Sequence, residues 1–212
     1  MRAVRTPVAA GVALLAAFVV LGVLVRGEPY GPDALIGQAL HDEWRGPAGF
    51  LAGVVSAVLG PVLPIVAAVV LVVAVLRLRH RGRADAARVV TRVLVLLLAC
   101  RATSWVAKPL FARERPRVYP DFAYPSGHVV SVACTGFAIV VLCLWLAPRL
   151  VSRAVRIAVL ATLLCAASRI VLDVHWLTDT IGAVLAVCGV GLLSGVALRL
   201  LPPARRGVAS SA

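Results

Sequence analysis

Residues 89–117 read VVTRVLVLLLACRATSWVAKPLFARERPR, and the change of character within this stretch decides the fold. Residues 89–107 are predominantly apolar, and roughly 20 such residues let a helix cross a bilayer core about 30 Å thick. Residues 108–117 then bring four cations and two prolines within ten positions. The stretch therefore predicts a membrane-spanning helix whose end carries concentrated positive charge.

Five more apolar runs of similar length accompany this one. Spanning segments must be helical unless they close into a barrel, and continuous runs exclude the alternating pattern of a barrel strand. The chain is 61% hydrophobic, whereas soluble domains are about 45–50% apolar. We therefore expect an all-α, polytopic membrane bundle of about six transmembrane helices, near residues 7–25, 60–76, 89–107, 129–146, 155–172 and 177–200.

Three segments need separate interpretation. Residues 31–44 combine helical periodicity with acidic ends, which predicts a surface segment outside the membrane. Residues 47–59 are apolar but short, and could be an interfacial helix or the first part of a kinked second span. The first run lacks a small-x-small cleavage pattern, which favours a retained anchor over a signal peptide.

The distribution of arginine orients the spans. With the N-terminus inside, the inner loops carry most of the 22 basic residues, and Asp85 is the one acidic residue there. Both termini should then be cytoplasmic, and the loops 26–46, 107–128 and 172–177 should face out. We expect a single domain over 1–212, with a core at about 60–200, an extracytoplasmic or interfacial segment at 26–59 and a cytoplasmic tail at 201–212.

The composition also narrows the partners. The net charge is +13, but aromatics make up only 6% and the arginines cluster between apolar runs, which favours lipid over nucleic acid. Without a C-x-x-C pair or a group of metal ligands, no zinc or redox site is indicated. The five cysteines are read as small buried hydrophobes: Cys100, Cys134, Cys143, Cys165 and Cys188.

KPLFARERPR, residues 108–117, places Lys108, Arg113, Arg115 and Arg117 on the outer side, where positive charge is normally scarce. Arginine matches phosphate oxygens bidentately and lysine adds a point charge. Snorkelling of these side chains to lipid head groups is the alternative. Pro109 and Pro116 should keep the stretch from being a plain helix. Arg101, about two turns deeper, could line a cavity or pair with a carboxylate.

YPSGH, residues 124–128, precedes the fourth run. Pro125 and Ser126 are typical of a helix start, where backbone N–H groups form an anion site. Gly127 would let an anion approach the backbone closely, and His128 could exchange a proton beside it. An ordinary capped helix with an interfacial histidine explains the same residues.

SRIVLDVHWLTD, residues 168–179, joins the last two runs. Arg169 lies near the outer end of the fifth run. His175 and Asp179, four apart, share a face if a helix begins there. A carboxylate on one ring nitrogen would orient the other as a nucleophile. A salt bridge at a helix start explains the pair equally well, but the topology brings all three stretches to one membrane face.

Together the three stretches resemble the type 2 phosphatidic acid phosphatase superfamily, the lipid phosphate phosphatases related to vanadium haloperoxidases. The K-x6-RP motif is Lys108 to Arg115-Pro116, the PSGH motif is residues 125–128, and the SR-x5-H-x3-D motif is Ser168-Arg169, His175 and Asp179. The resemblance implies a metal-independent phosphatase with its site at the extracytoplasmic face of six spans.

The resemblance also implies a role for each motif residue. Lys108, Arg115 and Arg169 would bind the phosphate, with added hydrogen bonds from Ser126 and Gly127. His175 would attack phosphorus with Asp179 orienting it. His128 would protonate the leaving group and later activate water.

Several alternatives stay open. The substrate could be phosphatidic acid, phosphatidylglycerol phosphate or undecaprenyl diphosphate, and transfer of phosphate between lipids would use the same residues. Vanadate-dependent halide oxidation could use them too. A phospholipid-binding or transport protein would need the cations but not the His175–Asp179 pair. Oligomeric state is not readable.

Overall fold

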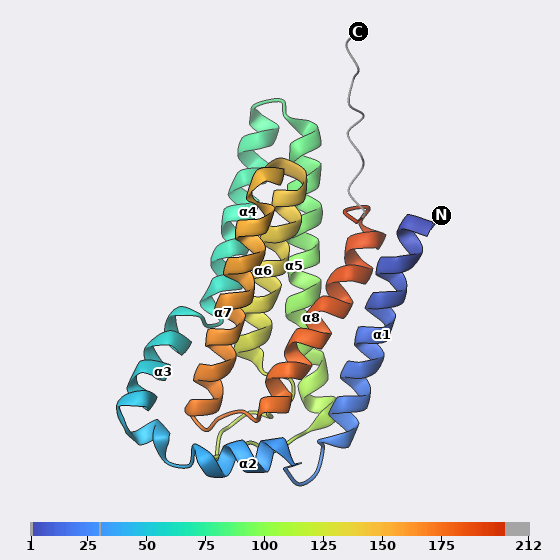
Figure 1. Cartoon of the computed structure of the whole chain (residues 1–212). Helices are drawn as coiled ribbons and strands as arrows, with labels where there is room; N and C mark the ends of the chain where they lie inside the picture. The colour runs from blue at the N-terminus through green and yellow to red at the C-terminus, as the bar shows by residue number, and fades with distance from the viewer. Residues whose placement is uncertain (1, 30, 202–212) are drawn as a thin grey trace.

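The computed structural model describes residues 2–29 and 31–201, and all regular structure within them is helical. The long helices stand side by side as a bundle (Figure 1). In chain order the elements are α1 Arg2–Leu24, α2 Pro32–Ala39, η1 Glu43–Arg45, α3 Pro47–Val58, α4 Val62–His80, α5 Ala84–Phe111, α6 Gly127–Leu146, η2 Pro148–Leu150, α7 Val151–Val171 and α8 Leu177–Ala197.

Six helical segments of the described chain are long and apolar enough to cross a membrane. Their outer faces expose large apolar side chains such as Ile65 and Leu163, which are 63% and 62% exposed. Such surfaces suit hydrocarbon, since a lipid-facing helix gains nothing by hiding them. The six-span, all-α expectation is confirmed, with α3 and α4 counted together as the second span.

The second span agrees with the kinked alternative of the two sequence interpretations. α3 ends at Val58 and α4 begins at Val62, and the turn between them holds Gly60 and Pro61. α3 leans away from the bundle axis and packs on α7 and η1 (Figure 1). α3 and α4 thus form one span with a sharp break between them, because Pro61 cannot donate a backbone hydrogen bond.

The core lies around α5 and α6, where Leu96, Leu97 and Val129 are fully buried. α1 packs along α8 through small residues. A Cβ on Gly11 would lie 3.2 Å from the carbonyl oxygen of Gly189, so glycine is needed for the helices to approach this closely.

Tyr124 fixes the loop that precedes α6. Its ring stacks on Phe18 of α1 with centroids 5.2 Å apart, and its hydroxyl donates to the Phe18 carbonyl at 2.7 Å. A Cβ on Gly182 of α8 would come within 2.3 Å of the same ring. The loop between α5 and α6 is therefore anchored to α1 and α8.

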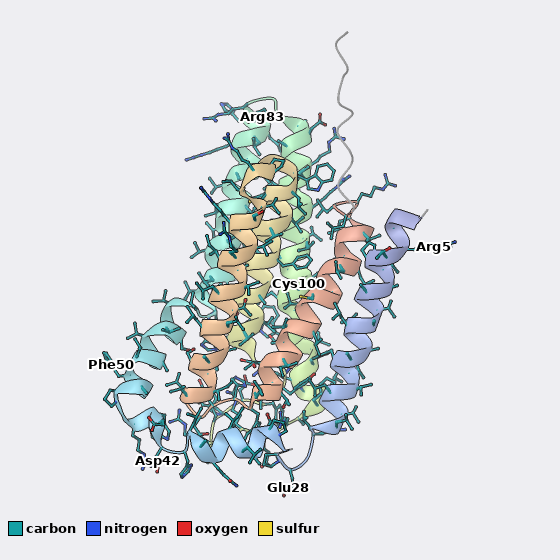
Figure 2. All side chains as sticks on the ribbon, viewed as in Figure 1. Arg5, Glu28, Asp42, Phe50, Arg83 and Cys100 are labelled. Carbon is teal, nitrogen blue, oxygen red and sulfur yellow. The ribbon has the colours of Figure 1, made fainter. Side chains whose placement is uncertain are left out.

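The two ends of the bundle differ in charge. Figure 2 places Arg5 and Arg83 at one end and Glu28 and Asp42 at the other, with Cys100 between them. The loops after α1, α5 and α7 gather at the end that carries Glu28, where α2 also lies (Figure 1). The distribution agrees with the expectation that this end faces out, which stays a prediction. The predicted tail lies outside the described residues from 202 onward.

Candidate active site

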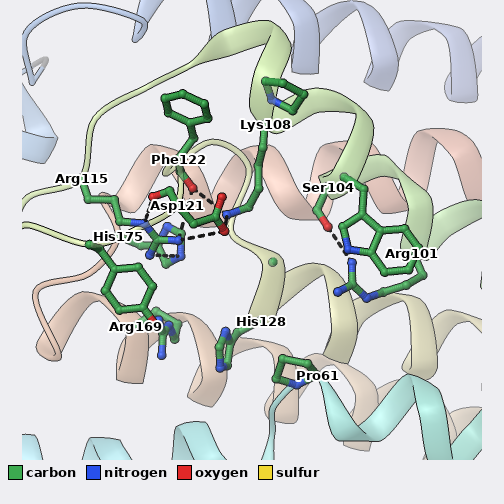
Figure 3. A pocket seen from close by; sticks show the side chains of 14 residues that line it. Pro61, Arg101, Ser104, Lys108, Arg115, Asp121, Phe122, His128, Arg169 and His175 are labelled. Carbon is green, nitrogen blue, oxygen red and sulfur yellow. Dashed lines mark hydrogen bonds and ion pairs between the residues drawn. The ribbon is translucent and has the colours of Figure 1, made fainter.

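The residues of the three motifs meet at the end of the bundle where α2 lies. A cavity of about 440 Å³ opens there, lined by residues of α5, α6 and α7, of the loops after α5 and α7, and of the α3–α4 turn (Figure 3). Of the predicted site residues, the cavity is lined by Lys108, Arg115, Gly127, His128, Arg169 and His175. Ser126 and Asp179 are fully buried behind this lining.

His175 and Asp179 form the arrangement expected from their spacing. α8 begins at Leu177, and the Asp179 carboxylate accepts the Trp176 N–H at 2.8 Å, which caps the helix. The same Oδ2 lies 3.3 Å from Nδ1 of His175. Capping the helix and holding the imidazole are thus one feature of the fold.

The other ring nitrogen of His175 faces the cavity. Nε2 lies 3.0 Å from Nη1 of Arg115, which can only donate, so Nε2 is the acceptor and the ring proton is on Nδ1. Burial, with the charges of Arg115 and Arg169, lowers the pKa of His175 well below its usual value. The imidazole is therefore neutral near pH 7 and keeps a lone pair on the cavity side.

Lys108, Arg115 and Asp121 form what we call the cavity cluster. The ammonium of Lys108 is paired with the Asp121 carboxylate and donates to the Phe122 carbonyl at 2.6 Å. Arg115 approaches the same carboxylate at 3.5 Å. Burial alone would raise the pKa of Asp121, but the hydrogen bond from Lys108 and the two cations outweigh it and hold that pKa below its usual value.

Arg169 and His128 complete the cavity wall. Arg169 is 5% exposed and donates to the Ser56 hydroxyl of α3 at 2.8 Å. Its buried Nε has no partner among the described residues. His128 makes no hydrogen bond in the described part of the chain, and the α3–α4 turn lies beside it, because a Cβ on Gly60 would be 3.6 Å from its ring. α3 thus helps to shape the site.

Ser126 and Gly127 begin α6 as the PSGH motif predicts. The Ser126 N–H donates to the Asp179 carbonyl at 3.1 Å, so this backbone group is already used. The buried Ser126 hydroxyl has no partner among the described residues. Gly127, at the first helical position, lies on the cavity wall, where its N–H has no partner within the helix.

Arg113 belongs to a second group of charges, which we call the buried cluster: Arg113, Asp33, Thr178 and Asp179. Arg113 is 1% exposed and donates to Asp33 at 2.7 Å and to Asp179 at 2.6 Å. Asp33, on α2, also accepts the Thr178 N–H at 3.0 Å. The expectation that Arg113 meets a phosphate is wrong, because carboxylates surround it.

One further expectation for the KPLFARERPR stretch changes and another is confirmed. Arg117 does not line the cavity and lies over the Trp44 ring, with 4.2 Å between its guanidinium carbon and the ring centroid. The stretch is not a plain helix, as expected, although α5 continues through Pro109 and ends at Phe111. A proline near the end of a spanning helix removes one backbone donor, which its neighbours compensate.

Arg101 lines the same cavity. It forms no ion pair with a carboxylate among the described residues, which decides between the two interpretations left open by the sequence. The motifs did not indicate Asp121 or Asp33. Asp121 lies between the motifs, and Asp33 is 145 residues from Thr178. Within residues 2–29 and 31–201, no three His, Cys, Asp or Glu side chains are grouped as metal ligands.

Comparison with known proteins gives one family and one fold. The family model of the PAP2 superfamily matches residues 89–199, which include all three motifs. A solved structure, the first transmembrane PAP2 type phosphatidylglycerolphosphate phosphatase from Bacillus subtilis, is similar with a TM-score of 0.68. It shares 20% identity and the match covers 92% of this chain and 98% of that one, which shows a common fold. No curated protein matches the sequence.

Proposed function

Because the chain belongs to the PAP2 superfamily, we propose that it is a membrane lipid phosphatase that works through a phosphohistidine intermediate. The observation that carries the proposal is the state of His175. Its Nδ1 is held by Asp179, and its Nε2 lone pair faces a cavity lined by Lys108, Arg115 and His128. A protein that only bound or transported phospholipid would need the cations but not an oriented imidazole.

In the first step, phosphate oxygens replace the Asp121 carboxylate on Lys108 and draw Arg115 away from Nε2. Nε2 then attacks phosphorus, and the bond from phosphorus to the leaving oxygen breaks with its electron pair on that oxygen. His128 supplies the proton that this oxygen takes up. Asp179 stabilises the charge that develops on the imidazole.

In the second step, water attacks the phosphorus of the phosphohistidine. His128 accepts the proton of the water, and the bond from phosphorus to Nε2 breaks with its electron pair returning to nitrogen. Inorganic phosphate leaves from Lys108, Arg115 and Arg169, and the starting enzyme is restored. Every group needed is a side chain of this chain, so we propose that catalysis needs no metal ion.

The substrate is a lipid phosphate or diphosphate whose head reaches the outer end of the bundle. Phosphatidic acid, phosphatidylglycerol phosphate and undecaprenyl diphosphate all qualify by chemistry. The related structure is of a phosphatidylglycerolphosphate phosphatase, which supports including that lipid among the substrates to be tested. We propose that the site faces away from the cytoplasm. Arg5 and Arg83 lie at the opposite end of the bundle, and loops rich in arginine stay on the cytoplasmic side (Figure 2).

The test is phosphate release in detergent with EDTA present, from all three lipids. We expect release by the wild type, loss of at least about a thousandfold in His175→Ala, and near wild-type rates in His41→Ala. His41 is the matched control because its exposed side chain lies at the same end and outside the cavity. No release from any lipid, or equal release by His175→Ala, would reject the proposal.

Orientation needs its own experiment. Val118 is 99% exposed in the loop after α5, and Arg81 is exposed in the loop between α4 and α5. A membrane-impermeant maleimide should label Val118→Cys in intact cells and label Arg81→Cys only after lysis, with the unsubstituted chain as background. The reverse pattern would place the site on the cytoplasmic side.

A further inference from the structure

Arg101 is a charged side chain within a spanning helix that the proposed mechanism does not use. It precedes Lys108 by seven residues on α5, which corresponds to roughly 10 Å along the helix axis. Its side chain turns toward the cavity end of α5: Nη1 donates to Ser104 Oγ at 2.6 Å, and the guanidinium lies 4.5 Å from the Trp105 ring centroid. Arg101 therefore reaches the cavity from its deeper side.

Nothing in the described chain neutralises this guanidinium. Arg101 has one side-chain hydrogen bond and one aromatic contact, and it forms no ion pair among the described residues. A guanidinium has five N–H donors, so most of them stay available to a ligand. A cation within a span is costly, and such residues generally mark a binding site or a pathway. The free donors on a cavity wall indicate that an anion binds there.

The position of Arg101 relative to His175 indicates which part of the substrate this anion belongs to. Figure 3 shows His175 and Arg115 at one side of the cavity, Arg101 at the opposite side, and His128 between them. In phosphoryl transfer the nucleophile and the leaving group lie roughly in line on opposite sides of phosphorus. Arg101 is therefore on the side to which the leaving group departs.

Exposed apolar surface also borders the cavity on that side, so a lipid tail would leave there. Trp105, which stacks with Arg101, is 65% exposed on the outer face of α5 and lines the cavity. A substrate whose terminal phosphate sits at Lys108 and Arg115 would pass Arg101 on its way to the bilayer. The group that Arg101 meets is the one between the terminal phosphate and the hydrocarbon.

We propose that Arg101 binds a second phosphate of the substrate, so that the preferred lipids carry two. This proposal rests on the proposed phosphatase function. In a diphosphate, the bond from the terminal phosphorus to the bridging oxygen breaks, and the leaving phosphate gains negative charge that Arg101 stabilises bidentately. In a glycerophosphate head group, Arg101 binds the phosphodiester instead. Both substrates present the same chemistry, a phosphate on the tail side.

The test compares matched pairs of lipids that differ in the second phosphate: an isoprenyl diphosphate with its monophosphate, and phosphatidylglycerol phosphate with phosphatidic acid of the same acyl chains. For each pair the ratio of kcat/KM is measured in wild type, Arg101→Gln and Arg92→Gln. Arg92→Gln is the control, because this substitution removes an arginine from the same helix at a position away from the cavity. We expect Arg101→Gln to lower the ratio about tenfold to a hundredfold in at least one pair.

The outcomes separate the two proposals. A lower ratio in the diphosphate pair alone, or in the phosphatidylglycerol phosphate pair alone, identifies the source of the second phosphate. Ratios unchanged in both pairs, with activity retained or lost equally on all lipids, would overturn the role of Arg101 and leave the phosphatase intact. Failure of the wild type to hydrolyse any lipid would instead overturn the proposed function.

A binding measurement decides the role of Arg101 without turnover. Calorimetry with inorganic pyrophosphate and inorganic phosphate is run on wild type, Arg101→Gln and Arg101→Lys. We expect Arg101→Gln to weaken pyrophosphate binding at least about tenfold relative to phosphate binding. Arg101→Lys should bind pyrophosphate with an affinity between those of wild type and Arg101→Gln, because lysine keeps the charge but loses the planar fork. Equal weakening for both anions would overturn the proposal.

Discussion

The buried cluster around Arg113 and the cavity cluster around Lys108 and Arg115 use the same kinds of charge a few residues apart. In the buried cluster, the Arg113 side chain is 1% exposed and those of Asp33 and Asp179 are 0% exposed. In the cavity cluster, the Asp121 side chain is 52% exposed. The difference lies in the carboxylates: those that pair with Arg113 cannot leave, whereas Asp121 can turn toward water.

Energetics explain why this difference matters for function. Removing one partner of a buried ion pair costs about 3–5 kcal/mol, whereas a partly exposed pair contributes about 0–1 kcal/mol. A phosphate can therefore replace Asp121 at small cost, and no ligand can replace Asp33 or Asp179. Asp179 joins the buried cluster to His175, with Oδ1 on Arg113 and Oδ2 on His175, and His175 in turn contacts Arg115 of the cavity cluster. In the proposed mechanism, the buried cluster holds the nucleophile and the cavity cluster offers cations to the substrate.

The largest effect should follow from Asp179→Asn, since this residue belongs to both functions. An amide cannot hold the His175 tautomer or stabilise its charge, so we expect kcat to fall about 10³-fold to 10⁴-fold. The measurement is phosphate release by detergent-purified protein. Asp173→Asn, in the loop before His175, is the control and should stay within about twofold, because Asp173 has no ion pair among the described residues. A loss below about tenfold would contradict the role of Asp179.

The next effect is on stability. Arg113→Met leaves Asp33 and Asp179 buried without a cation, so we expect a loss of about 3–5 kcal/mol in the free energy of unfolding. Thermal unfolding in detergent measures it, and Arg117→Met, which removes a cation that stacks on Trp44, should cost less than about 1 kcal/mol. If the two variants melted alike, the contrast between the clusters would fail.

Arg115→Gln should lose activity with a smaller loss of stability than Arg113→Met. One guanidinium is removed from the phosphate, so kcat/KM should fall about 10²-fold to 10³-fold. Arg115 also donates to the carbonyls of Val174 and Phe122, so the free energy of unfolding should fall by about 1–2 kcal/mol, without the further cost of a fully buried carboxylate left unpaired. Arg115→Lys should be intermediate, because a lysine keeps the charge without the fork. A melting temperature lowered as far as in Arg113→Met would show that Arg115 is structural.

The spans and the meeting of the motifs were readable from sequence for a physical reason. The length of an apolar run reflects the thickness of the bilayer core that a helix crosses. Residues at the ends of spans on one membrane face must therefore lie near each other. Lys108, His128, Arg169 and His175 are all at such ends, and the cavity brings them together. The sequence left open whether residues 47–59 lie at the interface or begin a kinked second span, because an apolar run shows its length and not its direction.

The sequence could not predict that Arg113 is buried among carboxylates while Arg115 lines the cavity. Both lie in an irregular segment after α5, which ends at Phe111 and is followed by Ala112 in the left-handed region with φ 47°. Without a regular period, two arginines two residues apart give no indication of which one points inward. The choice depends on Asp33, which reaches Arg113 only because α2 folds across the end of the bundle. Asp121 was missed because a single loop carboxylate has no pattern.

The smallest effect, and the most direct test of the cavity cluster, is Asp121→Asn. Asp121 and a phosphate compete for Lys108 and Arg115, so removing the carboxylate should strengthen binding. We expect KM for the lipid and the inhibition constant of inorganic phosphate each to fall about twofold to fivefold, as the loss of a half-exposed ion pair allows. Glu114→Gln is the control, an exposed acid on the same loop outside the cavity.

The pH dependence of this effect follows from the charge on Asp121. Lys108 and Arg115 hold the pKa of Asp121 below its usual value, so the carboxylate stays ionised and paired above that value. The competition is lost only when the pH falls through the lowered pKa. The ratio of wild-type to variant KM should therefore be constant from about pH 5 to about pH 8. A ratio that changed within this range would mean that Asp121 titrates there. A KM that rose in Asp121→Asn would mean that Asp121 positions the cations for the phosphate instead of competing with it.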